Sequence, residues 1–170
     1  HKTDLEGAFL EGSNLTGAFL GGANLNNTNI LESSIEFDYK ITPGSSISCF
    51  TPTPDGLSIA VGYMNGEVKV YELTGVCTNK IEAHGAKVMD IQFSGDGNWI
   101  LTAGADNLAK IHLLKSGECD NIFNEHTGPV NCVCYSPNEQ QVCTASNDKT
   151  IKIWKIEDGE CIETGSRHKY

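Results

Sequence analysis

The chain has 170 residues, of which 39% are hydrophobic and 20% are charged, and its formal net charge is −10. These values are typical of a folded globular protein and exclude a disordered chain. The sequence contains no run of lysine or arginine and no apolar stretch of the ~20 residues that a membrane helix needs, so we expect neither nucleic acid nor a membrane as a partner.

The first part of the chain repeats every five residues. A small side chain stands two positions before each bulky aliphatic one, and the aliphatic positions are Leu5, Leu10, Leu15, Leu20, Leu25, Ile30 and Ile35. A period of five fits neither a helix nor a strand, but it fits a four-sided coil in which each side directs one large and one small residue inward. The segment resembles the pentapeptide-repeat family, which implies a short right-handed four-sided β-helix stub over residues 1–37. Residues 38–46 break the pattern with Pro43 and Gly44 and are expected to be a linker.

The remainder of the chain repeats about every 42 residues. Each unit contains four short β-prone runs separated by turn residues; in the last unit these are 130–135, 141–144, 150–156 and 161–164. Four short strands per repeat are the make-up of one propeller blade. The sequence therefore predicts an all-β fold with three four-stranded antiparallel blades over residues 47–170, together with the start of a fourth.

Residues 45–170 resemble the WD-repeat family. The last unit carries Glu125-His126 and Trp154-Lys155 at the positions of the family's Gly-His and Trp-Asp pairs. In that family a turn aspartate bonds the histidine, the histidine bonds a hydroxyl on the second strand, and the hydroxyl bonds the tryptophan. The resemblance implies a structural hydrogen-bond network of His126, Thr144, Asp148 and Trp154, with Ser146 as a second candidate for the hydroxyl.

The other two units match this pattern less completely. The middle unit keeps His84, Thr102 and Asp106, but His112 stands in place of the tryptophan. In the first unit Asn65 and Tyr71 replace the aspartate and the tryptophan, and Val61 occupies the hydroxyl position. We expect a partial network in the middle unit and only the strand pattern in the first.

Three chemical alternatives compete with a structural interpretation. First, His126 and Asp148 could activate a nucleophile at Ser146 or Cys143. Second, Cys132 and Cys134 could bind zinc together with Cys143 and His126. Third, the acidic five-residue repeats could mimic DNA. The histidine, aspartate and cysteine positions follow the blade period or the alternation of a strand, and seven five-residue repeats make too short a rod. We therefore predict no catalytic, metal or cofactor site and no enzymatic activity.

The seven cysteines form an odd set in a chain without a visible secretion signal. We interpret them as reduced, buried thiols of a cytoplasmic protein. Cys77, Cys119 and Cys161 recur with the blade period and are expected to pack on the fourth strands.

We expect the chain to be a protein–protein interaction scaffold, a fragment of a larger multidomain repeat protein, without a small-molecule substrate. Its partners would be other proteins or attached domains of the same parent chain. The alternative is a sensor or regulatory arm of a signalling NTPase or effector enzyme whose catalytic domain lies outside these residues. Blade alignment indicates a candidate partner-facing set of Met64, Lys87, Met89, Ala105, Pro129, Asn131 and Asn147.

Overall fold

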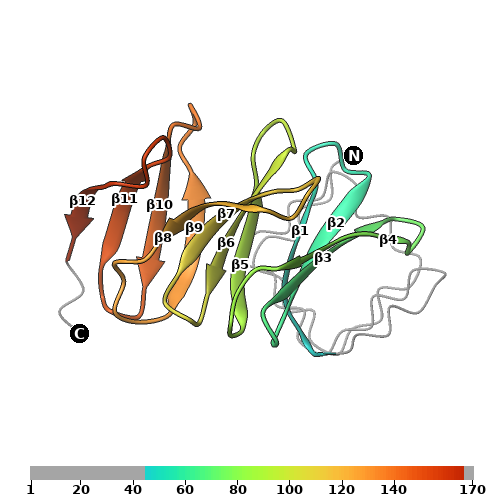
Figure 1. Ribbon diagram of the computed structural model, residues 1–170, viewed down its shortest axis with the longest axis horizontal. Coiled ribbons are helices and arrows are strands. Elements are labelled where there is room, and N and C mark those ends of the chain that lie inside the picture. The colour runs from blue at the N-terminus through green and yellow to red at the C-terminus, as the bar shows by residue number, and fades with distance from the viewer. Residues whose placement is uncertain (1–44, 167–170) are drawn as a thin grey trace, which may run out of the picture.

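The computed structural model describes residues 45–166, which form twelve β-strands. The strands make three four-stranded antiparallel sheets that lie side by side (Figure 1). Sheet 1 contains β1 (Ile47–Pro52), β2 (Ser58–Tyr63), β3 (Glu67–Glu72) and β4 (Cys77–Glu82). Sheet 2 contains β5 (Val88–Phe93), β6 (Trp99–Gly104), β7 (Ala109–Leu113) and β8 (Cys119–Phe123). Sheet 3 contains β9 (Val130–Tyr135), β10 (Gln141–Ser146), β11 (Ile151–Lys155) and β12 (Cys161–Gly165).

Strand order within every sheet follows chain order. The prediction of an all-β chain with three four-stranded antiparallel blades is therefore confirmed. The β-helix stub predicted for residues 1–37 lies outside the described residues, and the predicted domain limits stay predictions. Over residues 45–166 the structure contains no helix long and apolar enough to cross a membrane.

The turn between the first and second strands has one design in all three sheets. A hydroxyl donates to the Asp or Asn side chain two residues later, and that side chain accepts a backbone N–H further along the turn, an arrangement that fixes a tight turn locally. The hydroxyl–acceptor pairs are Thr53–Asp55 (2.6 Å), Ser94–Asp96 (2.6 Å) and Ser136–Asn138 (2.7 Å). Because the strands are antiparallel, the turns between third and fourth strands lie at the same end of the sheets, which we call the Asx-turn end.

The core lies between neighbouring sheets. β6 and β7 direct one face toward sheet 3, and the two surfaces share a cluster built from Leu101, Ala103, Ala109, Ile111, Phe123, Val130, Val133, Val142 and Trp154. Sheets 1 and 2 share a matching cluster of Ala60, Val68, Val70, Ile81, Ala83, Val88, Ile91, Phe93 and Ile100. Burial of these apolar surfaces is the main favourable contribution to the fold.

Side chains of β5 satisfy the backbone edge of the next sheet. Asp90 accepts the N–H of Val133 at 3.0 Å, and Gln92 accepts the N–H of Tyr135 at 2.7 Å. Burial raises the pKa of Asp90, and the hydrogen bond from Val133 partly offsets that effect. These bonds let β5 and β9 lie side by side without forming one continuous sheet, since a buried backbone donor needs an acceptor.

The turns between second and third strands need a left-handed residue at one position. Gly66, Asn107 and Lys149 occupy it, with φ of 89°, 71° and 68°. At Gly66 the chain also passes close to itself, because its carbonyl accepts the N–H groups of Ala83 (3.1 Å) and His84 (3.0 Å). A Cβ at Gly66 would overlap the carbonyl group of His84.

Replacing Gly66 with alanine should therefore lower the free energy of unfolding by at least about 2 kcal/mol, since both the backbone conformation and the backbone contact oppose a side chain. Gly85→Ala is the matched control, because a Cβ there meets no atom within 4 Å. Urea unfolding of both variants measures the difference. Equal losses at the two positions would contradict this account of the turn.

Candidate functional site

Four polar or aromatic side chains that the sequence assigns to the last unit meet inside sheet 3. His126 precedes β9, Thr144 lies on β10, Asp148 lies in the β10–β11 turn and Trp154 lies on β11. His126 Nδ1 lies 2.7 Å from Asp148 Oδ2, His126 Nε2 lies 2.6 Å from Thr144 Oγ1, and Trp154 Nε1 lies 2.9 Å from Thr144 Oγ1. His126, Thr144 and Trp154 are at most 5% exposed, so this is a buried network.

The chemistry of these groups gives each hydrogen bond a direction. The indole N–H of Trp154 can only donate, so Thr144 Oγ1 accepts from it. The hydroxyl proton of Thr144 is then donated to His126 Nε2, and the Nδ1–H of His126 is donated to the carboxylate of Asp148. Every polar atom in the chain from indole to carboxylate has a partner, which is what burial requires.

Asp148 receives more hydrogen bonds than the sequence indicated. Thr150 donates to it from its backbone N–H at 2.8 Å and from its hydroxyl at 2.6 Å, and the N–H of Thr127 donates at 3.1 Å. Burial raises the pKa of Asp148, but the bonds from Thr150 and His126 outweigh it, so the pKa lies well below its usual range. Thr150 was missed because the family pattern has no role for it, although its hydroxyl also lies 3.2 Å from His126 Nδ1.

Sheet 2 contains the same arrangement without its last member. His84 lies 2.9 Å from Asp106 through Nδ1 and 2.9 Å from Thr102 through Nε2. His112 stands on β7 where Trp154 stands on β11, but its Nδ1 faces the carbonyl of Gly117 at 3.4 Å. The Nε2 of His112 is buried without a hydrogen-bond partner.

Burial controls the charge of His84. It lowers the pKa of His84 to about 4, although the neighbouring carboxylate of Asp106 acts in the opposite direction. The imidazole is therefore neutral at pH 7, and its contact with Asp106 is a hydrogen bond rather than an ion pair.

Sheet 1 replaces the network with a pair of tyrosines. Val61 is fully buried at the hydroxyl position, and Tyr71 pairs through its hydroxyl with Tyr63 at 2.9 Å. Burial raises the pKa of Tyr63 far above its usual value, so the hydroxyl of Tyr63 stays protonated. Tyr63 was missed because the corresponding positions of the later sheets hold Gly104 and Ser146.

The side chains proposed for a catalytic arrangement point in different directions. Ser146 donates to the carbonyl of Gly128 at 2.9 Å and accepts the N–H of Asp148, so it contacts neither the imidazole nor the indole. Cys143 pairs with Ile153 on the strand face opposite to Thr144. Among residues 45–166 no three His, Cys, Asp or Glu side chains are placed to share a metal ion.

The expectation of buried cysteines is wrong for four of the seven, whereas Cys49 and Cys161 are partly buried and pack against the core. All seven are free thiols, and Cys77, Cys119, Cys132 and Cys134 are exposed. Cys77 and Cys119 lie on the outermost strands rather than in packed positions. Cys132 and Cys134 lie on the face of sheet 3 that no other described sheet covers.

The candidate partner-facing residues gather at the end of the sheets opposite to the Asx-turn end. In each sheet a residue of the turn between the second and third strands donates its N–H to the carbonyl of the residue just before the first strand. The pairs are Met64 to Ser46 (2.9 Å), Ala105 to Lys87 (2.8 Å) and Asn147 to Pro129 (2.9 Å). We call this the paired-turn end. Met64 and Asn147 are exposed there, whereas Met89 is half-buried against the core. Asn131 donates to the side chain of Asn147 at 2.7 Å.

The two networks generate a prediction about their shared threonine. Thr144→Val leaves both the indole N–H and His126 Nε2 without a partner, and should cost roughly 2–4 kcal/mol of unfolding free energy. Thr102→Val leaves only His84 Nε2 unpaired, so its cost should be smaller, about 1–3 kcal/mol. Chemical denaturation of both variants checks the order, and an equal or reversed order would contradict the assigned donor directions.

A second prediction concerns pH. The pKa of His84 falls from 6.5 to about 4 on folding, so the unfolded chain binds more protons between these values. The contribution of His84 to the free energy of unfolding should be complete above pH 6.5 and should be lost as the pH falls toward 4. The total loss should be roughly 3 kcal/mol. NMR titration of the imidazole measures this directly, and a midpoint near 6.5 in the folded chain would contradict it.

Comparison with known proteins agrees with this geometry. The family model described as WD domain, G-beta repeat matches residues 75–112 and 117–155, and the model described as pentapeptide repeats matches residues 1–30. Each WD match begins just before the last strand of one sheet and ends within the third strand of the next, so a sequence repeat spans two neighbouring sheets.

The chain matches parts of larger proteins. The SIR4-interacting protein SIF2 of Saccharomyces cerevisiae is 27% identical over 73 residues, 43% of this chain and 14% of that protein. The Autophagy-related protein 16 of Arabidopsis thaliana is 33% identical over 58 residues, 34% of this chain and 11% of that protein. The chain thus matches only a small part of either relative.

Solved structures show the same fold at low sequence identity. The structure of U3-55K and the crystal structure of RRP9 WD40 repeats each superpose on 75% of this chain with a TM-score of 0.69 and 21% identity, which covers 41% and 40% of those chains. Residues 75–112 and 117–155 of the chain therefore match WD40 repeats, residues 1–30 match pentapeptide repeats, and the described sheets have the fold of the WD40-repeat structures.

Proposed function

We propose that the chain is a non-catalytic protein-interaction scaffold that binds a partner protein through its paired-turn end. The main support is the backbone hydrogen bonding at that end. In each of the three sheets it holds the turn between the second and third strands against the residue that precedes the first strand. A rigid frame that positions exposed loop residues is the usual way in which a fold of this kind presents a binding surface.

The use of polar groups supports a role without chemistry. The imidazoles of His84 and His126 each have partners at both nitrogens, and Asp148 is saturated by donors of its own turn. The hydroxyls that face the Nε2 atoms, those of Thr102 and Thr144, are fully buried, so neither is open to a substrate as a nucleophile would have to be. The hydrogen bonds in these networks instead stabilise the sheets.

Charge supports a protein partner over nucleic acid. Residues 45–166 contain sixteen acidic residues and eight lysines. Nucleic-acid binding relies on an excess of basic residues that neutralise phosphates, and this charge balance is the opposite.

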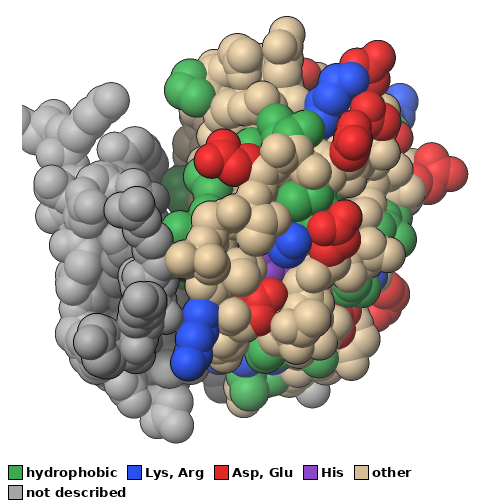
Figure 2. All heavy atoms as spheres, turned by 90° about the vertical axis from the view of Figure 1, so that its left-hand side faces the viewer, with side chains coloured by type: hydrophobic (Ala, Val, Ile, Leu, Met, Phe, Trp, Pro, Cys, Tyr) green, Lys and Arg blue, Asp and Glu red, His purple; other side chains and the backbone are tan. Residues whose placement is uncertain are grey.

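The outer face of sheet 3 supports membership of a longer repeat protein. In sheet 2 the paired positions Leu101–Ile111 and Ala103–Ala109 are buried by sheet 3. Their counterparts in sheet 3, Cys143–Ile153 and Ala145–Ile151, pair in the same register, and Ile151 is 42% exposed. Figure 2 views this side of the molecule, where hydrophobic side chains reach the surface among charged ones. A further sheet of the same repeat type would bury them as sheet 3 buries sheet 2.

No feature of residues 45–166 favours the sensor arm of an NTPase or effector enzyme over this scaffold. That alternative depends on a catalytic domain outside the sequence.

A photocrosslinking experiment tests the proposed binding end. A benzophenone amino acid placed at Met64, in the full chain expressed in its own organism, should yield specific protein adducts, because that side chain is 47% exposed at the paired-turn end. The matched control carries it at Asp120, which is exposed on β8. Excess unmodified chain should compete the adducts away, whereas excess chain with Lys87→Ala and Asn147→Asp should not. Equal adducts at both positions would count against the proposal.

A further inference from the structure

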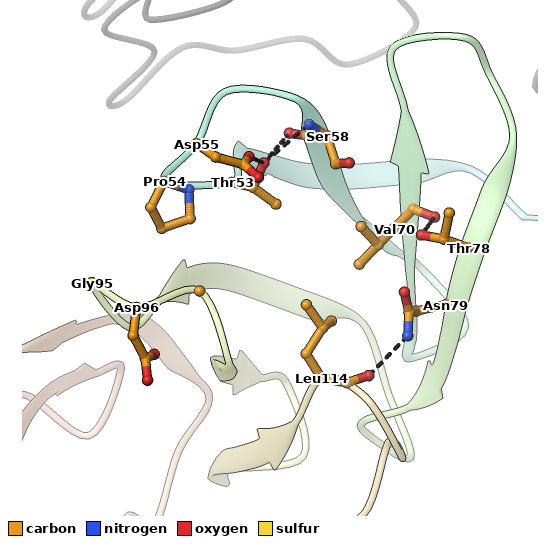
Figure 3. A pocket seen from close by; sticks show the side chains of 11 residues that line it. Thr53, Pro54, Asp55, Ser58, Val70, Thr78, Asn79, Gly95, Asp96 and Leu114 are labelled. Carbon is orange, nitrogen blue, oxygen red and sulfur yellow. Dashed lines mark hydrogen bonds between the residues drawn. The ribbon is translucent and has the colours of Figure 1, made fainter.

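A groove of about 430 Å³ lies between sheets 1 and 2 at the Asx-turn end (Figure 3). Asn79, which lines it, donates to the carbonyl of Leu114 at 2.9 Å. The same bond recurs between sheets 2 and 3, where Asn121 donates to the carbonyl of Ile156 at 2.7 Å. The bond therefore belongs to the repeat, and we assign no ligand to the groove.

The outer face of sheet 3, on the side that faces the viewer in Figure 2, departs from the repeat in its thiols. Cys132 and Cys134 on β9 are exposed, and Cys143 on β10 is partly exposed. Sheet 2 has no cysteine at the corresponding positions, which are Asp90, Gln92 and Leu101. The fold of the repeat thus does not require sulfur at any of the three.

The strand register brings two of these thiols together. Cys134 lies directly opposite Cys143, whereas Cys132 lies opposite Ala145. Directly opposite residues have Cβ atoms about 4.5–5.5 Å apart, whereas diagonal neighbours are about 7–8 Å apart. Two positions along one strand are separated by about 6.6 Å. Because a disulfide needs about 3.5–4.5 Å between its Cβ atoms, Cys134 and Cys143 are the pair of the three that can be joined with a small adjustment.

The other four cysteines are not placed to form such a pair. All seven cysteines lie within residues 45–166. Cys77, Cys119 and Cys161 lie on the fourth strands of three different sheets, each opposite an aromatic ring. Burial raises the pKa of Cys49 to about 12, so its thiolate hardly forms at neutral pH.

The backbone around the pair indicates how stable a bond between the two sulfurs would be. Val133 and Tyr135 donate their N–H groups to side chains of β5, away from β10. The N–H of Cys134 points the other way along the alternating strand, toward β10, so Cys134 and Cys143 form a hydrogen-bonded pair, the type with the wider spacing. A disulfide across this pair would be strained, and strain makes a disulfide easier to reduce.

We propose that Cys134 and Cys143 form a reversible disulfide by exchange with a low-molecular-weight disulfide such as oxidised glutathione. Cys134 Sγ, as the thiolate, attacks one sulfur of the small disulfide, forms a mixed disulfide with it and releases one small thiol. Cys143 Sγ then loses its proton and attacks Cys134 Sγ, and the second small thiol leaves. The two protein thiols are oxidised by two electrons, and the small disulfide is reduced to two thiols.

The surroundings of the two thiols set the order of these steps. Cys134 is exposed and meets the oxidant first. Burial raises the pKa of Cys143, and the Cys134 thiol beside it raises the pKa further, so Cys143 is suited to the second attack, on a sulfur already in contact. The inference does not rest on the proposed binding through the paired-turn end. It gives the outer face of sheet 3 two chemical states, and a further sheet packed on this face would shield both thiols.

Thiol exchange in the full 170-residue chain tests the pair. The chain is incubated with oxidised glutathione, free thiols are blocked by alkylation, and the product is digested with chymotrypsin, which cleaves after tyrosine and so at Tyr135, between the two cysteines. Mass spectrometry should find the peptides of Cys134 and Cys143 joined by a disulfide, and reduced glutathione should restore both thiols. Cys132 should carry glutathione instead, because no second thiol lies within reach.

Two serine variants make the test specific. Cys143→Ser removes the second attacking thiol, so Cys134 should keep its glutathione and the linked peptides should fall at least about tenfold. Cys132→Ser is the matched control: it removes another exposed thiol from the same strand face and should change the yield less than about twofold. Both variants should fold, because serine is close to cysteine in size and neither side chain is buried.

Three results would overturn the inference. The first is a chain in which Cys134 does not react with oxidised glutathione. The second is a chain in which Cys134 keeps glutathione although Cys143 is present. The third is a loss of linked peptides in Cys132→Ser as large as that in Cys143→Ser, which would mean that the register does not select the pair.

Discussion

The buried imidazole between two sheets is the interaction on which the local architecture depends. His126 follows the last strand of sheet 2 and precedes the first strand of sheet 3, so its hydrogen bonds fix the passage of the chain from one sheet to the next. One nitrogen is held by the turn carboxylate of Asp148 and the other by Thr144 inside the sheet. A buried imidazole with either nitrogen free would be costly, so the connection has one well-defined position. The paired turn itself does not need the imidazole, since Met64 donates to Ser46 in sheet 1, which has no such network.

The three sheets show that this network is not needed for the strand arrangement itself. Sheet 3 has all four members, sheet 2 lacks the indole, and sheet 1 has a buried tyrosine pair. All three keep the same strand order and pack through matching apolar clusters. Burial of apolar side chains, which is non-directional, thus determines how the sheets pack. The hydrogen bonds of the buried histidine fix the path of the chain from one sheet to the next.

The sequence predicted the strands because periodicity is a local property, and it could not predict features that depend on distant residues. Thr144 and Ser146 alternate onto one strand face, so the pattern alone left both open; the irregular pairing between Ala145 and Ser146 directs the serine to Gly128 instead. Cys132 and Cys134 were expected to be buried because their alternation with Val133 on one strand suits packing, but alternation does not tell which face of the strand a neighbouring sheet covers. The bond from Val133 to Asp90 likewise joins residues 43 positions apart, which no single repeat reveals.

The two ends of the sheets use their acidic residues in different ways. At the paired-turn end Asp106 and Asp148 each accept a hydrogen bond from a buried imidazole, and their charge is committed to the interior. At the Asx-turn end Asp55 and Asp96 accept only from their own exposed turns. A carboxylate that serves a buried donor cannot change partner without destabilising the sheet, whereas Asn138 shows that a turn of the exposed kind keeps its hydrogen bonds without a carboxylate. The same repeat therefore places acids that hold a buried imidazole at one end and acids that serve only an exposed turn at the other, so the loss of a carboxylate leaves a buried group unpaired only at the first end.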